Sequence, residues 1–215
     1  MGLFNLIAWQ DFIGFTLTAA AIVASPGPDT MLILRNSFLG GRRVGLYTVA
    51  GVQLGLVGHT LMAVLGLAAL LAASPIAFKI IAICGAAYLG FLGIQTLRGG
   101  IIAGDPAQAG TVKVTAASAV RDATFTNLLN PKVILLFLAL MPQFVDTTRG
   151  HVSLQMLIFS AWLLVLNVLW QSPLALLAEA MRKLLLQPSA QRAVNWLTGA
   201  ILLFFAGLLL YDYIA

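Results

Sequence analysis

The sequence predicts an all-α membrane protein of six transmembrane helices, arranged as two inverted three-helix repeats, and three observations lead to this class. Of its 215 residues, 60% are hydrophobic and only 9% are charged, whereas soluble domains carry about 25% charged residues. Six long stretches are almost free of Asp, Glu, Lys and Arg, and two of them are interrupted by proline motifs about half a chain apart. This composition excludes a soluble globular enzyme and a disordered chain.

The six apolar stretches are the predicted spans, since a helix needs about 20 residues to cross the hydrocarbon core. Two spans each tolerate one ionisable residue, Asp29 in the first and Lys132 in the fourth. The predicted spans cover residues 12–34, 44–73, 80–97, 123–145, 150–178 and 193–211.

Lys and Arg gather in alternate loops, which predicts the orientation. The loops on the side predicted to be periplasmic hold only Lys79 and Arg149. Both termini are therefore expected to be periplasmic. The net charge of +5 is explained by the attraction of the Lys and Arg residues of the other loops to anionic lipid at the inner leaflet. No basic stripe is interleaved with aromatics, so we expect no nucleic-acid partner. The loops predicted to be cytoplasmic carry Arg35, Arg42, Arg43, Arg98, Lys113, Arg121, Arg182, Lys183 and Arg192.

The longest hydrophilic segment, residues 98–122, is rich in Gly, Ala and Thr and is typical of a linker. It divides the chain into a first three-span repeat, 1–97, and a second, 123–215. Three spans are an odd number, so a duplicated half must insert upside down, as in many secondary transporters.

Similar interruptions in spans 1 and 4 support the repeat. The motifs SPGPD (25–29) and NLLNPK (127–132) break these two spans. Ser25 and Asn130 are good N-cap residues, and a proline follows each of them. We therefore expect two half-helix N-termini to face each other near mid-membrane, where their N–H groups suit a carboxylate. The alternative is a purely structural kink at each proline.

Asp29 and Lys132 need an explanation, because a charge at the bilayer centre costs about 2.5–3.5 kcal/mol. Asp29 is interpreted as a proton carrier or partner of a substrate ammonium, and Lys132 as a ligand for a carboxylate. Structurally, Asp29 could instead complement a helix dipole, and Lys132 could reach out to the membrane surface. The two could also pair with each other.

Five further polar residues are candidates to line a translocation path. The small-residue pattern Gly51-xxx-Gly55 is better explained by close helix packing than by chemistry. The sequence has one cysteine, no HExxH motif and no P-loop motif, so no catalytic, cofactor-binding or metal-binding residue is predicted. The candidate path-lining residues are Gln53, His59, Asn127, Asn167 and Gln171.

Four segments resemble the LysE/RhtB family of lysine and threonine–homoserine exporters, most closely its RhtB-type branch. The most specific motifs are PGP in span 1 and NPK in span 4, and span 5 is the weakest match. The segments are SPGPDTMLILRNSFLGGRRVGL (25–46), GVQLGLVGHT (51–60), GAAYLGFLGIQTLR (85–98) and NLLNPKVILLFLALMPQFV (127–145).

The resemblance implies a secondary transporter of the bacterial inner membrane that exports amino acids or their derivatives by proton antiport. It implies no enzyme activity and no cofactor, and it leaves a homodimer open. The expected partners are thus an amino-acid substrate, protons and the lipid bilayer. The motif positions carried over as substrate-binding residues are Pro26, Gly27, Pro28, Asp29, Asn130, Pro131 and Lys132.

Two alternative functions are compatible with a membrane protein of this composition. A metal-cation efflux protein is disfavoured because the sequence has no clustered His, Cys or carboxylate ligands. A membrane-embedded enzyme would have to use Asp29, and a two-carboxylate mechanism finds no partner because Asp146 lies at a span end.

Overall fold

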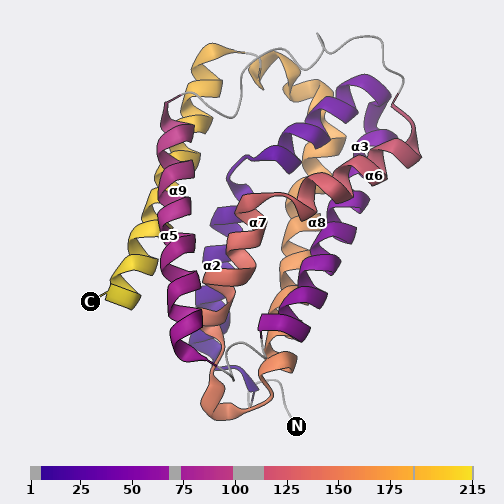
Figure 1. Cartoon of the computed structure of the whole chain (residues 1–215). Coiled ribbons are helices and arrows are strands. Elements are labelled where there is room, and N and C mark those ends of the chain that lie inside the picture. Colours follow the sequence, from indigo (N-terminus) through magenta and orange to yellow (C-terminus); the bar gives the residue numbers. More distant parts are fainter. Residues whose placement is uncertain (1–5, 68–73, 99–113, 186, 215) are drawn as a thin grey trace.

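The computed structural model describes residues 6–67, 74–98, 114–185 and 187–214, and every regular element in them is helical (Figure 1). The predicted all-α class is therefore confirmed for this part of the chain. Most of the predicted linker, residues 99–113, lies outside the described residues. The helices are α2 (Trp9–Ala24), α3 (Pro28–Met62), η1 (Ala63–Leu67), α5 (Pro75–Leu97), α6 (Ala116–Leu128), α7 (Pro131–Leu135), η3 (Leu136–Leu140), η4 (Met141–Phe144), η5 (Thr147–Arg149), α8 (Val152–Leu185) and α9 (Pro188–Ile214).

Several helices are long and apolar enough to cross a bilayer, as expected of a multi-pass membrane protein. α6 and the helical segment from α7 to η4, Pro131–Phe144, together form a further candidate span that is bent by 48° at its break, and α2 is a shorter apolar helix. The four long candidates in the described residues are Pro28–Gly66, Lys79–Leu97, Val152–Ala180 and Pro188–Tyr211.

Gly41 turns the chain back inside α3 without any loop. Its φ of 76° and ψ of 179° are not helical, and a positive φ favours glycine. The loop expected around Arg35, Arg42 and Arg43 is therefore helical on both sides of this single residue. In Figure 1 the two parts of α3 form a sharp bend at the upper right.

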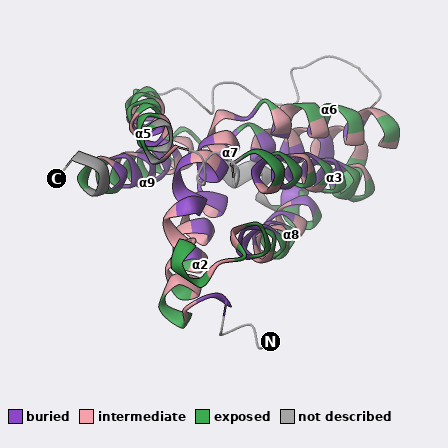
Figure 2. Ribbon diagram, turned by 60° about the horizontal axis from the view of Figure 1, so that its bottom comes forward, coloured by how far each residue is buried: buried purple, intermediate pink, exposed green. Residues whose placement is uncertain are grey.

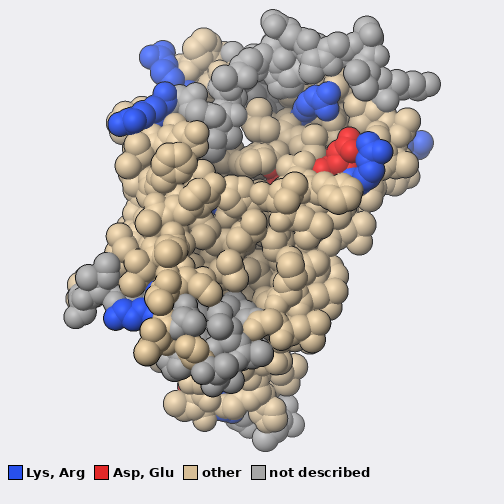
Figure 3. Space-filling model, viewed as in Figure 1, with Lys and Arg blue, Asp and Glu red and all other residues tan. Residues whose placement is uncertain are grey.

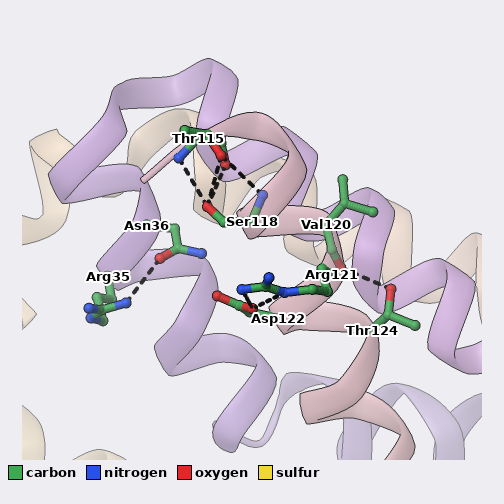
Figure 4. Close-up of polar contacts among 8 residues, drawn as sticks. All are labelled: Arg35, Asn36, Thr115, Ser118, Val120, Arg121, Asp122 and Thr124. Carbon is green, nitrogen blue, oxygen red and sulfur yellow. Dashed lines mark hydrogen bonds and ion pairs between the residues drawn. The ribbon is translucent and has the colours of Figure 1, made fainter. Parts of the chain in front are cut away.

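α6 begins at Ala116, seven residues before the predicted start of this span at residue 123. The cause is a capping box formed by Thr115 and Ser118 (Figure 4). The Ser118 backbone N–H donates to Thr115 Oγ1 at 3.2 Å, and the Thr115 backbone N–H donates to Ser118 Oγ at 3.0 Å. These bonds satisfy two N–H groups that a helix start otherwise leaves unpaired.

The helices pack as two groups on either side of α2 and α7 (Figure 2). α5 lies along α9 on one side, and α3 packs against α6 and α8 on the other. The α5–α9 contact is close, because a Cβ at Gly199 would approach the Gly93 carbonyl oxygen to 2.9 Å. α2 and α7 thus lie between the two groups.

The predicted packing role of the Gly51-xxx-Gly55 pattern is confirmed. A Cβ at Gly51 would overlap the Val120 carbonyl of α6, and one at Gly55 would come within 2.5 Å of Asn127 Oδ1. The Thr124 hydroxyl donates to the Gly51 carbonyl at 3.0 Å. The two helix backbones approach this closely only because both glycines lack side chains.

We expect Gly51→Ala to lower the unfolding free energy by about 1–3 kcal/mol, because the new methyl overpacks the α3–α6 contact. Gly207→Ala in α9 is the matched control, since a Cβ there would meet no atom within 4 Å. Thermal unfolding of both detergent-solubilised variants provides the measurement. Equal midpoints for the two variants would show that the α3–α6 contact tolerates side chains.

Candidate functional site

Four helix ends meet in the middle of the molecule, where the two proline motifs interrupt the helices. α2 ends at Ala24 and α3 begins at Pro28, while α6 ends at Leu128 and α7 begins at Pro131. Figure 1 shows the two interruptions side by side, at about the same height. Segments separated by about half the chain are thereby brought into contact.

Asp29 and Lys132 occupy the same position in two different helices. Pro28 and Pro131 are the first residues of α3 and α7, so the residue that follows each proline is the second. The predicted N-cap role of Asn130 is confirmed, since its Oδ1 accepts the Lys132 backbone N–H at 3.1 Å. The two interruptions thus place opposite charges at equivalent points.

The predicted N-cap role of Ser25 is wrong, because Ser25 instead ends α2. Its backbone N–H donates to Ala21 O at 3.1 Å and its hydroxyl to Ile22 O at 2.7 Å. A proline disfavours helical conformation in the residue that precedes it, and this motif has prolines at positions 26 and 28. The backbone therefore stays extended through Gly27, which is the N-cap of α3.

The Asp29 carboxylate is held by the second interruption. It is only 6% exposed, and its Oδ2 accepts the side-chain N–H groups of Asn127 and Asn130, each at 2.9 Å. Its Oδ1 is buried and has no hydrogen-bond partner in the described residues. Asn127, expected only to line a path, is therefore a direct partner of the carboxylate.

The Lys132 ammonium is held by the first interruption. Its Nζ donates to Ser25 O at 2.6 Å, to Ile22 O at 2.9 Å and to Ser25 Oγ at 3.4 Å. These carbonyls belong to the C-terminal end of α2, which carries the negative end of the helix dipole. The interpretation that Lys132 reaches out to the membrane surface is therefore wrong. Across the described chain, no ion pair joins Lys132 to Asp29.

We call these two sets of contacts the crossed bonds: Asp29 to Asn127 and Asn130, and Lys132 to Ile22 and Ser25. Each interruption contributes the charge that the other one binds. The sequence did not indicate the carbonyl acceptors, although a helix that ends inside the protein leaves its last carbonyls in need of donors.

Asp29 and Lys132 both line a small cavity of about 20 Å³. Asn167 and Gln171 of α8 also line it, so these two candidate residues lie at the same place as the charges. The Gln171 amide donates to Asn167 Oδ1 at 2.9 Å. Such a cavity holds about one water molecule, so a larger ligand requires the helix ends to separate.

His59 and Gln53 lie on the same helix but in different settings. His59 Nε2 donates to the Asn127 carbonyl at 3.2 Å, and its ring stacks on Phe137 at a centroid distance of 5.5 Å. Both side-chain amide atoms of Gln53 are buried without a partner in the described residues. Those residues contain no group of three or more His, Cys, Asp or Glu that could hold a metal ion.

Helices interrupted next to a buried carboxylate and a partly buried ammonium, in a chain with several apolar helices, are typical of membrane transport proteins. Residues 20–213 match the family model of the LysE type translocators. The chain therefore belongs to the LysE type translocator family, and the resemblance noted in the sequence is confirmed.

Several curated relatives support this assignment. The chain is 32% identical over 203 residues to YrhP, an uncharacterized membrane protein of Bacillus subtilis (strain 168), covering 91% of this chain and 96% of the relative. It is 30% identical to a homoserine/homoserine lactone efflux protein of Salmonella typhi, covering 94% and 97%. It is also 31% identical to a leucine efflux protein of Salmonella choleraesuis (strain SC-B67), covering 78% and 77%. No solved structure matches the chain.

Two substitutions of Asn130 separate its two roles. Asn130→Ala removes both the helix cap, worth about 1 kcal/mol, and a hydrogen bond to a carboxylate, worth about 1.5–3 kcal/mol. Asn130→Ser keeps a capping oxygen and removes only the bond to Asp29. We expect both variants to unfold at a lower temperature than the wild type, and the alanine variant to be the less stable one. Wild-type midpoints in both variants would contradict the described contacts.

Proposed function

We propose that this protein is a secondary transporter that exports amino acids or their derivatives by proton antiport, through a mid-membrane site between the two interruptions. The observation that carries the proposal is the set of crossed bonds, which hold a carboxylate and an ammonium at the lining of one cavity. An amino acid carries the complementary pair of charges. The names of the homoserine and leucine efflux relatives support the same class of substrate.

The proposal includes six spans in two inverted repeats, residues 1–97 and 123–215, joined by a cytoplasmic linker at 98–122. α2 and the part of α3 before Gly41 form span 1, and α6 to η4 form span 4. The remainder of α3 packs on α8, and α5 packs on α9. In an inverted repeat, a two-fold axis in the membrane plane pairs span 2 with span 5 and span 3 with span 6, so these contacts favour the inverted arrangement.

In the proposed site, the substrate ammonium binds Oδ1 of Asp29, which is a buried acceptor without a described partner. The substrate carboxylate binds the Lys132 ammonium and takes it from the carbonyls of Ile22 and Ser25. Binding therefore breaks one of the crossed bonds and loosens the contact between the two halves. This loosening is the event that allows one half to rock against the other.

Proton coupling follows from competition for one oxygen atom. A proton on Asp29 Oδ1 removes the negative charge that attracts the substrate ammonium. The proton and the ammonium therefore exclude one another, and a carrier that moves only with one of them bound exchanges the two. Such exclusive occupancy is sufficient for antiport.

The orientation in the proposal rests on charge. In Figure 3 most of the Lys and Arg side chains lie in the upper part of the view, where α6 begins in Figure 1. We assign this end to the cytoplasm of a bacterial inner membrane. Both termini then belong to the periplasmic side.

Asp29→Asn and Lys132→Ala are expected to reduce export to background, because each removes one of the two charges that bind the substrate. Cells loaded with dipeptides and assayed for released amino acids provide the measurement, with immunoblots of membranes to verify insertion. Asp122→Asn and Lys79→Ala, at exposed positions, are the matched controls. Wild-type export by both site variants would remove these charges from the mechanism.

A phosphatase reporter fused after Ala215 is expected to be active, because this enzyme folds only in the periplasm and the proposed topology places the C-terminus there. A green fluorescent reporter at the same position should be dark. The opposite pair of signals would reverse the topology and leave the site itself unaffected.

A further inference from the structure

A second, larger cavity lies next to the crossed bonds and has no role in the mechanism above. Its volume is about 400 Å³, within the range of about 300–1,000 Å³ that is usual for small-ligand sites. It lies between the end of α3 with η1 on one side, and α6 to η3 on the other. His59, Met62 and Gly66 form one wall, and Leu128, Ile134 and Phe137 form the other.

Both walls contain a π-helical segment. Ala63–Leu67 and Leu136–Leu140 are π-helices, one from each half of the chain, and they contact each other. π-helical turns make up well under 1% of residues in proteins and occur frequently at functional sites. Two of them beside one cavity point to a ligand more than to simple helix packing.

Asn127 links the lining of this cavity to the candidate site by hydrogen bonds. The Asn127 carbonyl accepts the bond from His59, which lines the cavity, and the Asn127 side chain donates to Asp29. The next residue, Leu128, lines the cavity itself. An amino acid whose ammonium binds Asp29 therefore has its side chain within reach of this space.

The walls select against a charged side chain. Among the described residues that line the cavity, His59 is the one polar residue, and its Nε2 already donates to the Asn127 carbonyl. A lysine or arginine side chain would lose its water here without gaining a carboxylate partner, which is costly. An apolar side chain loses nothing and gains contacts.

We propose that this cavity receives the side chain of the exported amino acid and selects large apolar side chains over basic and very small ones. The proposal rests on the proposed function, and it adds the substrate class. A lipid acyl chain is the competing occupant. It would need neither the buried histidine nor the link to Asp29, so we commit to the substrate side chain.

Gly66 offers the sharpest test, because it lines the cavity and a Cβ there would meet no atom within 4 Å. Gly66→Phe fills the cavity, and Gly66→Ala fills it slightly. Gly207→Phe in α9, at a position equally open, is the matched control. Met62→Trp, at a residue that is 57% exposed, provides a second filling variant that does not depend on the glycine.

Release of leucine, phenylalanine, alanine and lysine is measured from cells loaded with the corresponding dipeptides. We expect the wild type to export leucine and phenylalanine at least several-fold faster than alanine and lysine. Gly66→Phe and Met62→Trp should lower leucine export several-fold more than alanine export, Gly66→Ala should have a smaller effect, and Gly207→Phe should have none.

Two results would overturn the substrate class and leave the proposed function standing. One is a wild type that exports lysine or alanine fastest. The other is a ratio of leucine export to alanine export that is the same in both filling variants as in the wild type. This is the result expected for a cavity that holds only lipid. The absence of release for every amino acid by a wild type present in the membrane would instead overturn the proposed function.

Discussion

The structure depends on the crossed bonds between the two proline interruptions. A charge inside a membrane protein is tolerated only where it is bonded, and here the partners of each charge come from the other half of the chain. Asp29 relies on Asn127 and Asn130, and Lys132 relies on the end of α2. These contacts therefore join the two halves, and a substitution at one interruption alters the bonds of the charge at the other.

Close packing of α6 against α3 positions Asn127, a hydrogen-bond partner of the Asp29 carboxylate. Because Gly55 has no side chain, Asn127 fits against α3 at a point where a Cβ would approach its Oδ1 to 2.5 Å. From there the Asn127 amide reaches Asp29, and its carbonyl receives His59. The glycine pattern of α3, which the sequence explains by packing alone, therefore also determines the geometry of the charged site and its connection to the larger cavity.

The sequence was sufficient where the structure follows from local rules. Apolar length predicted the helices, and Asn130 before Pro131 predicted the start of α7. The prediction for Ser25 was wrong because a second proline, at position 28, delays the start of the next helix. A loop was expected between spans 1 and 2, but Gly41 alone makes this turn inside one helix, because its positive φ reverses the chain in a single residue. The acceptors of Lys132 are backbone carbonyls, which have no sequence signature, so they emerged only from the three-dimensional arrangement.

The two charges are not equally free to meet a substrate, and this difference bears on the order of the proposed transport steps. Asp29 keeps one oxygen without a described partner, whereas the Lys132 ammonium is already bonded to two carbonyls. A substrate ammonium therefore finds a free acceptor, but a substrate carboxylate must displace existing bonds. Capture at Asp29 then precedes release of Lys132 from α2, and it is this second step that separates the halves. In this order, the free energy of substrate binding is used to open the site only after the substrate is held.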